Sequence, residues 1–202
     1  MKQQKWMNIY NSILRLRFYA FLELKKSFVI NEFDTHFQEF VDDFNLNKNK
    51  DKAKFFGGQM LIGLSYLILV RTNEYIKNEL SEREAIDVLK IDNWKIIEIS
   101  SYEAFVFKYN ISVKRLKEKN KKGILLYNND SQKLNYFINK LRNSVSHYRY
   151  DTDIDNIILT DINPNNNDIE MKCSLKYSDF LNFCADYGTI VNDTLIKKRI
   201  IV

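Results

Sequence analysis

The chain has 202 residues, of which 45% are hydrophobic, and this is enough apolar side chain for one core in a single domain covering residues 1–202. One proline and five glycines in this length favour helices and argue against a turn-rich β fold. The net charge of +5 is compatible with a polyanionic partner but does not require one.

No targeting segment or membrane span is expected. Residues 1–6 are polar and basic, and the longest apolar run, residues 60–70, is shorter than the roughly 20 residues that cross a bilayer. Cys173 and Cys184 follow no metal-ligand or redox spacing, so we expect both to be reduced. The sequence thus predicts a cytoplasmic protein without a membrane partner.

Apolar residues that recur every three or four positions predict most of the chain to be helical. The predicted helices cover residues 5–28, 32–44, 60–80, 82–89, 92–109, 131–150 and 176–198. His36 lies between the apolar positions of the second helix, so we expect it to be exposed and not a ligand.

A small β-hairpin is predicted before the last helix. Residues 157–159 and 169–175 are rich in β-branched and apolar side chains, and they flank the turn sequence Asn-Pro-Asn-Asn-Asn at 163–167. The expected fold class is therefore all-α: a bundle of five or more helices with one small hairpin.

The helix predicted over residues 131–150 carries the sequence Arg-Asn-Ser-Val-Ser-His at 142–147. At about 100° per residue, Asn143 and His147 project about 140–180° away from the apolar face, one turn apart. Arg142 lies about 140° from His147 around the axis, a gap that its long side chain can partly close. The apolar face consists of Leu134, Ile138, Leu141, Val145 and Tyr148.

This motif on a late helix, followed by a short polar hairpin and a last helix, resembles the HEPN superfamily. The resemblance is most specific over residues 131–198. It implies a small all-helical protein that cuts RNA without a metal or other cofactor, as a toxin or antiphage effector. It also implies a homodimer, which sets two motifs across a cleft, and a cognate antitoxin protein as a partner.

RNA cleavage without a metal needs a base for the 2′-OH, an acid for the leaving 5′ oxygen and a cation for the developing charge. Histidine titrates near neutral pH, and arginine keeps its charge and matches phosphate geometry. We therefore predict His147 as general base or acid, Arg142 as the stabilising cation and Asn143 as a positioning group. The expected products carry a 2′,3′-cyclic phosphate or 3′-phosphate and a 5′-OH.

Further contacts to RNA are predicted close to the motif, from Lys140, Tyr148, Arg149 and Tyr150. In HEPN toxins that pair with minimal nucleotidyltransferase antitoxins, a tyrosine that receives adenylates follows the histidine by two positions. This chain has Arg149 there, which puts neutralisation by adenylylation in doubt.

No metal site is expected. Asp151, Asp153 and Asp155 alternate after the motif, but Asn156 and Ile162 stand where a calcium loop has its glycine and glutamate. We interpret the three acids as turn and cap residues.

The basic run from Lys114 to Lys122 leaves two interpretations open: a surface that tracks RNA, or a solvated helix face or loop. The function also has alternatives. One is a non-catalytic HEPN-like module that binds a partner protein, a nucleotide or RNA. Another is a structural helical protein without a ligand.

Overall fold

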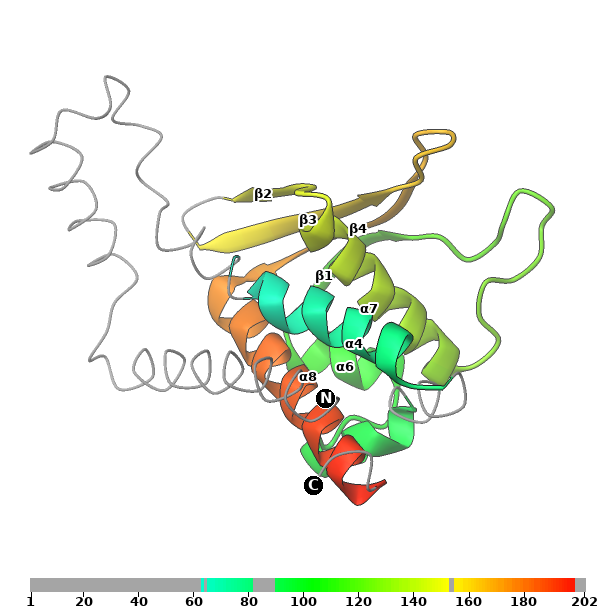
Figure 1. The fold of residues 1–202 in the computed structure, drawn as a ribbon. Helices are drawn as coiled ribbons and strands as arrows, with labels where there is room; N and C mark the ends of the chain where they lie inside the picture. The colour runs from blue at the N-terminus through cyan, green and yellow to red at the C-terminus, as the bar shows by residue number, and fades with distance from the viewer. Residues whose placement is uncertain (1–62, 64, 82–89, 153–154, 199–202) are drawn as a thin grey trace, which may run out of the picture.

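The computed structural model describes residues 63, 65–81, 90–152 and 155–198. Within these ranges a four-stranded antiparallel sheet lies against a layer of helices (Figure 1). The helices predicted over residues 5–28, 32–44 and 82–89, and with them His36, lie outside the described residues. No helix in the described ranges is long and apolar enough to cross a membrane.

The apolar run predicted as a buried helix is helical in its described part. Leu67–Arg71 forms a π-helix (η2), which continues as α4, Thr72–Glu79. Ile68, Leu69 and Val70 are buried, as their hydrophobicity requires. The wider π turn is a local irregularity of the kind often found at functional sites.

The single helix predicted over residues 92–109 is wrong, because the structure has two. Ile91–Ile97 is a 3₁₀-helix (η3) that ends at Glu98 in the left-handed conformation, with φ 65°. The second helix, α6, covers Tyr102–Lys108 and begins at Ser101, whose hydroxyl accepts a hydrogen bond from the Ala104 amide. A serine cap of this kind starts a new helix. The break between the two helices was not predicted, because apolar residues follow helical spacing on both sides of it.

Two long helices form the body of the helical layer. Asn129 caps α7, Asp130–Ser146, by accepting a hydrogen bond from the Gln132 amide. The last helix, α8, is Tyr177–Lys197, and its apolar side chains Phe180, Cys184, Tyr187, Val191 and Leu195 are buried.

An aromatic cluster joins η3, α6, α7 and α8. The Phe105 ring lies 5.6 Å from Trp94, 5.3 Å from Phe183 and 6.1 Å from Phe137, all edge-to-face. Such pairs add to the free energy gained from burying the rings. All four side chains have an exposed fraction of 1% or less.

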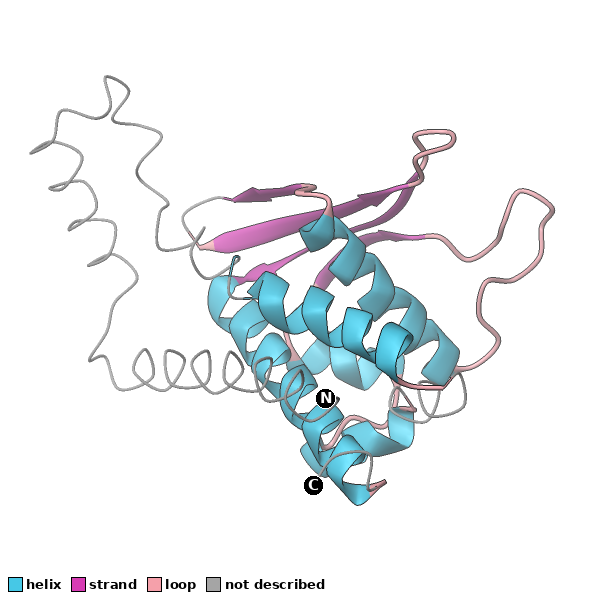
Figure 2. Cartoon of the chain, in the orientation of Figure 1, coloured by secondary structure: helices cyan, strands magenta, loops and turns pink. Residues whose placement is uncertain are grey.

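The all-α prediction is wrong because the predicted hairpin belongs to a sheet of four strands (Figure 2). The hairpin itself is confirmed. The strands are β1 (Ser112–Leu116), β2 (Tyr150–Thr152), β3 (Asn156–Ile162) and β4 (Ile169–Lys176), in the order β1-β4-β3-β2.

The two outer strands carry weak sequence signals. β1 is part of the basic run and has a bulge between Val113 and Arg115, which breaks the alternation of apolar and polar residues. β2 has three residues and follows α7 after a short turn. It was not predicted, because the helical periodicity of α7 was extended across it to residue 150.

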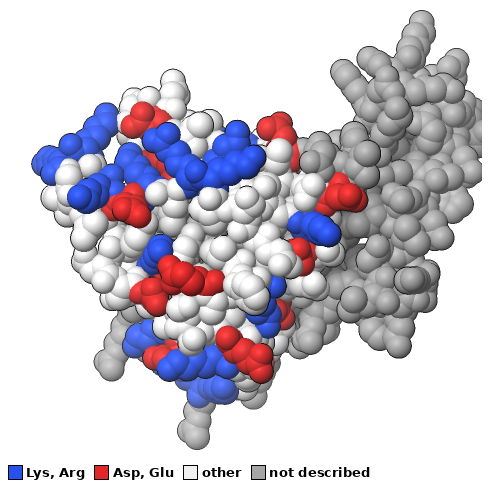
Figure 3. All heavy atoms as spheres, turned by 180° about the vertical axis from the view of Figure 1, so that it is seen from behind, with Lys and Arg blue, Asp and Glu red and all other residues white. Residues whose placement is uncertain are grey.

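The sheet has one buried and one open face. On β4, Met171, Cys173 and Leu175 are buried against α7 and α8, and Lys172 and Ser174 alternate with them on the opposite face. From behind, Lys and Arg side chains gather in a band at the top of the view, where the sheet lies in Figure 1 (Figure 3).

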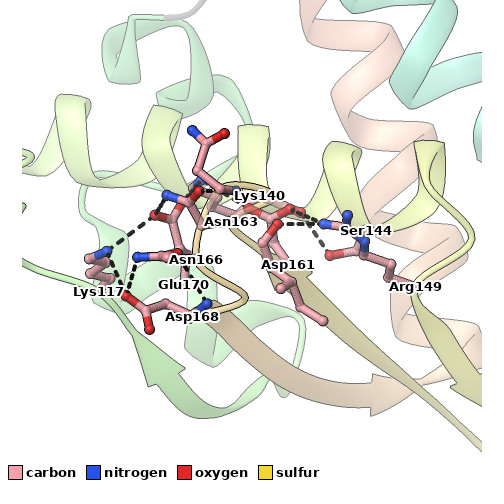
Figure 4. Close-up of polar contacts among 11 residues, drawn as sticks. Lys117, Lys140, Ser144, Arg149, Asp161, Asn163, Asn166, Asp168 and Glu170 are labelled. Carbon is pink, nitrogen blue, oxygen red and sulfur yellow. Dashed lines mark hydrogen bonds and ion pairs between the residues drawn. The ribbon is translucent and has the colours of Figure 1, made fainter.

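A cluster of charged side chains, in which Asp161 is buried and Lys140 and Glu170 are half-buried, connects α7 to the hairpin on the helical side of the sheet (Figure 4). The Lys140 ammonium lies 2.9 Å from Asp161 on β3 and 2.5 Å from Glu170 on β4. Glu170 also accepts hydrogen bonds from Asn163 and Lys117, at 3.0 and 3.3 Å. Because buried charges are costly without partners, these contacts fix the position of the hairpin on α7.

The pKa of Glu170 reflects this cluster. Burial alone would raise it, but hydrogen bonds from Lys140, Asn163 and Lys117 outweigh burial and lower the pKa from 4.5 to about 2. Burial also opposes the charge of Lys140, yet its bonds to Glu170 and Asp161 raise its pKa. Both groups are therefore charged at neutral pH.

We expect Glu170→Gln to lower the free energy of unfolding at pH 7 by on the order of 3 kcal/mol, the equivalent of this pKa shift. A carboxylate with a depressed folded pKa stabilises the fold above its unfolded pKa, and this contribution is lost as pH falls from about 4.5 to about 2. The difference between wild type and variant should therefore shrink across that range in urea titrations.

Glu103→Gln is the control, because Glu103 forms an exposed pair with Lys133 on the surface. It should change stability by well under about 1 kcal/mol. Equal losses in the two variants would contradict the assignment of the buried cluster.

Candidate functional site

The C-terminal end of α7 holds the predicted motif, and it is shaped by backbone hydrogen bonds. The helix ends at Ser146, so His147 is the C-cap residue and not part of the helix. The amide of Tyr148 donates to Val145 O and the amide of Arg149 to Ser144 O, at 3.3 and 2.8 Å. These two bonds form a Schellman motif, which turns the chain sharply into β2.

His147 and Asn143 lie one turn apart, as predicted. The His147 amide donates to Asn143 O at 2.9 Å, His147 is exposed and Asn143 is half-buried. Neither side chain has a hydrogen-bond partner within the described part of the chain. The imidazole and the carboxamide are therefore available to the same external group.

Arg142 points to a different side of α7. It is half-buried, and its Nε is buried without a hydrogen-bond partner among the described residues. Its charge acts on Tyr187 of α8 and on Lys77 of α4. Burial, and then the charge of Arg142, lower the pKa of Lys77.

Arg142 and Lys77 therefore place two cations near each other, and neither has a carboxylate within ion-pair distance in the described ranges. Tyr187 is fully buried, and its hydroxyl accepts a hydrogen bond from Asn73 at 3.0 Å. Two neighbouring cations without an acid between them favour an external anion. Lys77 is not among the predicted site residues, because it comes near Arg142 only in the packed fold, where η2, the helix that continues into α4, contacts α7.

Two of the predicted phosphate contacts are bound within the protein. Lys140 is paired with Asp161 and Glu170. Arg149 donates to Ile162 O at 2.5 Å and lies 3.9 Å from Asp161. Both side chains therefore hold the hairpin in place.

The two tyrosines next to His147 differ. Tyr150 lies half-buried in β2, and burial raises its pKa. Tyr148 is 77% exposed and has the left-handed conformation, with φ 54°. An exposed aromatic side chain directly beside His147 can stack on a base.

No group of three or more His, Cys, Asp or Glu that could hold a metal occurs among the residues that the structure describes. Both cysteines are free and buried. Burial raises the pKa of Cys173 to about 12, so this thiol is not a nucleophile at neutral pH.

Comparison with known proteins gives one match. A model of the protein family described as HEPN pEK499 p136 matches residues 7–198, which is nearly the whole chain. No curated protein matches the chain, and no solved structure does.

Tyr148→Gly tests the strain at the end of α7. Glycine adopts the left-handed conformation freely and tyrosine does not, so the substitution should raise the free energy of unfolding by about 1 kcal/mol. The measurement is urea unfolding at pH 7. Ser146→Gly is the control, because position 146 lies in the last helical turn; this variant should be less stable than wild type. Destabilisation by both would contradict strain at Tyr148.

Proposed function

The chain belongs to the HEPN pEK499 p136 family, and on this premise we propose that it is a metal-independent endoribonuclease. Arg142, Asn143 and His147 would carry the reaction. The observation that carries the proposal is the end of α7, where an exposed imidazole lies one turn from a carboxamide, and where Arg142, on another side of the helix, has no acidic partner within the described residues.

Each residue has one role in this proposal. His147 takes the proton of the 2′-OH or gives a proton to the leaving 5′ oxygen, since its exposed ring can reach both. Arg142 stabilises the charge that develops on the phosphate, and the lack of an ion pair at its guanidinium within the described ranges supports this role. Asn143 orients the imidazole or a phosphate oxygen.

One histidine cannot be base and acid in the same step, so we propose that the active form is a homodimer. His147 is exposed at the end of its helix, and this supports a site that a second copy completes. The partner's motif would then supply the second proton-transfer group.

We further propose that the nuclease acts in the cytoplasm as the toxin of a toxin–antitoxin pair or as an antiphage effector, with a cognate protein that restrains it. The support is the family together with the motif. Expression of the wild type should arrest growth, and His147→Ala should not.

Cleavage in EDTA tests the catalytic proposal. Wild-type protein should cut total RNA and leave 5′-OH ends, whereas His147→Ala and Arg142→Ala should each lose at least about 100-fold in rate. Lys95→Ala, at an exposed lysine on η3, is the control and should cleave normally. All variants should give the same thermal unfolding curve as wild type within about 2 °C.

Cleavage that needs a divalent metal, or that leaves 5′-phosphate ends, would overturn the mechanism. If no variant and no wild-type sample cleaves RNA, the chain is a binding module of the same family. Equal cleavage by wild type and His147→Ala would show that His147 is not catalytic.

Mixing wild-type and His147→Ala chains tests the shared site. If each reaction needs both histidines, heterodimers of wild-type and variant chains are inactive. An equal mixture should then have about half the activity that the same amount of wild-type protein has without the variant, because half of the wild-type chains pair with a variant chain. Unchanged activity would mean that each copy works alone. Subunit exchange is confirmed by fluorescence transfer between labelled copies.

A further inference from the structure

We propose that the open face of the sheet, together with the loop after β1, is a track that binds the backbone of an RNA strand and leads it to His147. The inference rests on the proposed function, because it assigns a second surface to the same substrate. We name this surface the basic track and define it by Lys114, Arg115, Lys119, Lys121, Lys122 and Lys172.

The cations of the basic track have no partners in the part of the chain that the structure describes. None of the six has an ion pair or a side-chain hydrogen bond within the described residues, and all except Lys172 are exposed. In the same region Lys117 and Lys140 are paired with carboxylates in the buried cluster. The track is therefore the part of this basic region whose charge is available to a ligand.

Two of these cations oppose each other across neighbouring strands. Arg115 on β1 is directly opposite Lys172 on β4, on the open face of the sheet. Like charges at opposed positions destabilise a sheet, so the pair costs stability in the free protein. An anion between the two side chains would remove that cost, which favours a phosphate ligand.

The row of residues across the sheet runs from this pair to the motif. Lys172 is opposite Thr160 on β3, and the Thr160 amide donates to the Arg149 carbonyl at 3.0 Å. Neighbouring strands lie about 4.8 Å apart, so the row from Arg115 to Arg149 spans about 14 Å. A strand of RNA bound along it reaches the turn that holds His147.

The other end of the track is hollowed. A cavity of about 560 Å³ lies between the loop after β1 and the turn between β3 and β4, and Lys121 and Lys122 line it. Lys117 and Glu170 of the charge cluster also line it, and they are paired with each other at 3.3 Å. The cavity thus offers the two cations of Lys121 and Lys122 to a phosphate.

RNA fits this surface better than a membrane does. Ile124 and Leu125 at the loop are 59% and 50% exposed, and such side chains could enter a lipid surface or stack on bases. The cations, however, continue from the loop onto β1 and β4 and are not confined to the loop. Figure 3 shows Lys and Arg side chains gathered in a band at the top of the view. An extended polyanion matches that distribution.

Two pairs of substitutions test the track. Lys121→Gln with Lys122→Gln removes charge at the cavity, and Arg115→Gln with Lys172→Gln removes it on the sheet. The control pair, Lys95→Gln with Lys197→Gln, makes the same change in net charge on η3 and α8. Binding is measured by fluorescence anisotropy with a 2′-O-methyl RNA of about 12 nucleotides. This RNA is not cleaved, because it has no free 2′-OH to attack the phosphate.

Each track variant should bind this RNA about tenfold more weakly at 0.1 M salt. The slope of log K against log salt concentration should become smaller in magnitude by about 1.4, because each variant loses two phosphate contacts with single-stranded RNA. The control pair should bind as wild type does. With cleavable RNA, the track variants should raise KM and leave kcat unchanged. Removal of the opposed Arg115 and Lys172 charges should not lower stability, so loss of folding does not explain weaker binding.

Equal weakening in the control pair would overturn the track, because net charge alone would then explain binding. So would unchanged RNA affinity in both track variants. Two further probes are vesicles that contain anionic lipid and, separately, polyglutamate. If the track variants weaken binding to the vesicles and RNA does not bind, the surface belongs to a membrane. If they weaken binding to polyglutamate and RNA does not bind, it belongs to an acidic protein. Track-dependent binding without cleavage would retain the track and reject the nuclease.

Discussion

The contact of Lys140 with Asp161 and Glu170 sets the geometry on which the rest of the structure depends. It joins the middle of α7 to both strands of the hairpin in a place where water is largely excluded, and Asp161 is only 3% exposed. Such a cluster tolerates few arrangements, because any shift leaves a buried charge without its partner. The sheet therefore has one position on the helical layer, and the turn after α7 has one direction.

The charge distribution divides the basic residues into two groups with different consequences. Lys117, Lys140 and Arg149 have partners within the protein and act on its shape. Arg142 and the cations of the basic track lack such partners within the described residues, and no carboxylate there neutralises their charge. Sequence alone does not separate the groups, because a lysine looks the same whether or not a distant carboxylate reaches it.

The sequence predicted what local spacing determines. The apolar periodicity of α7 and α8 and the asparagine-rich turn of the hairpin are local signals, and the structure has all three elements. β1 and β2 were missed because each owes its strand conformation to pairing with residues far away in the chain. The motif was found because its residues are neighbours in sequence, whereas Lys77 meets Arg142 only in the packed fold. For the same reason the sequence does not show that Lys140 and Arg149 have partners within the protein.

The two edges of the sheet limit how copies of this protein can associate. β2 offers three residues to an additional strand, and β1 is interrupted by a bulge and carries adjacent cations that would repel a second β1. Growth of the sheet from one molecule into the next is therefore disfavoured on both sides, which also protects the protein from aggregation through exposed strands. Copies that associate must use other surfaces, and the end of α7 lies apart from the strand pairing that fibrils exploit.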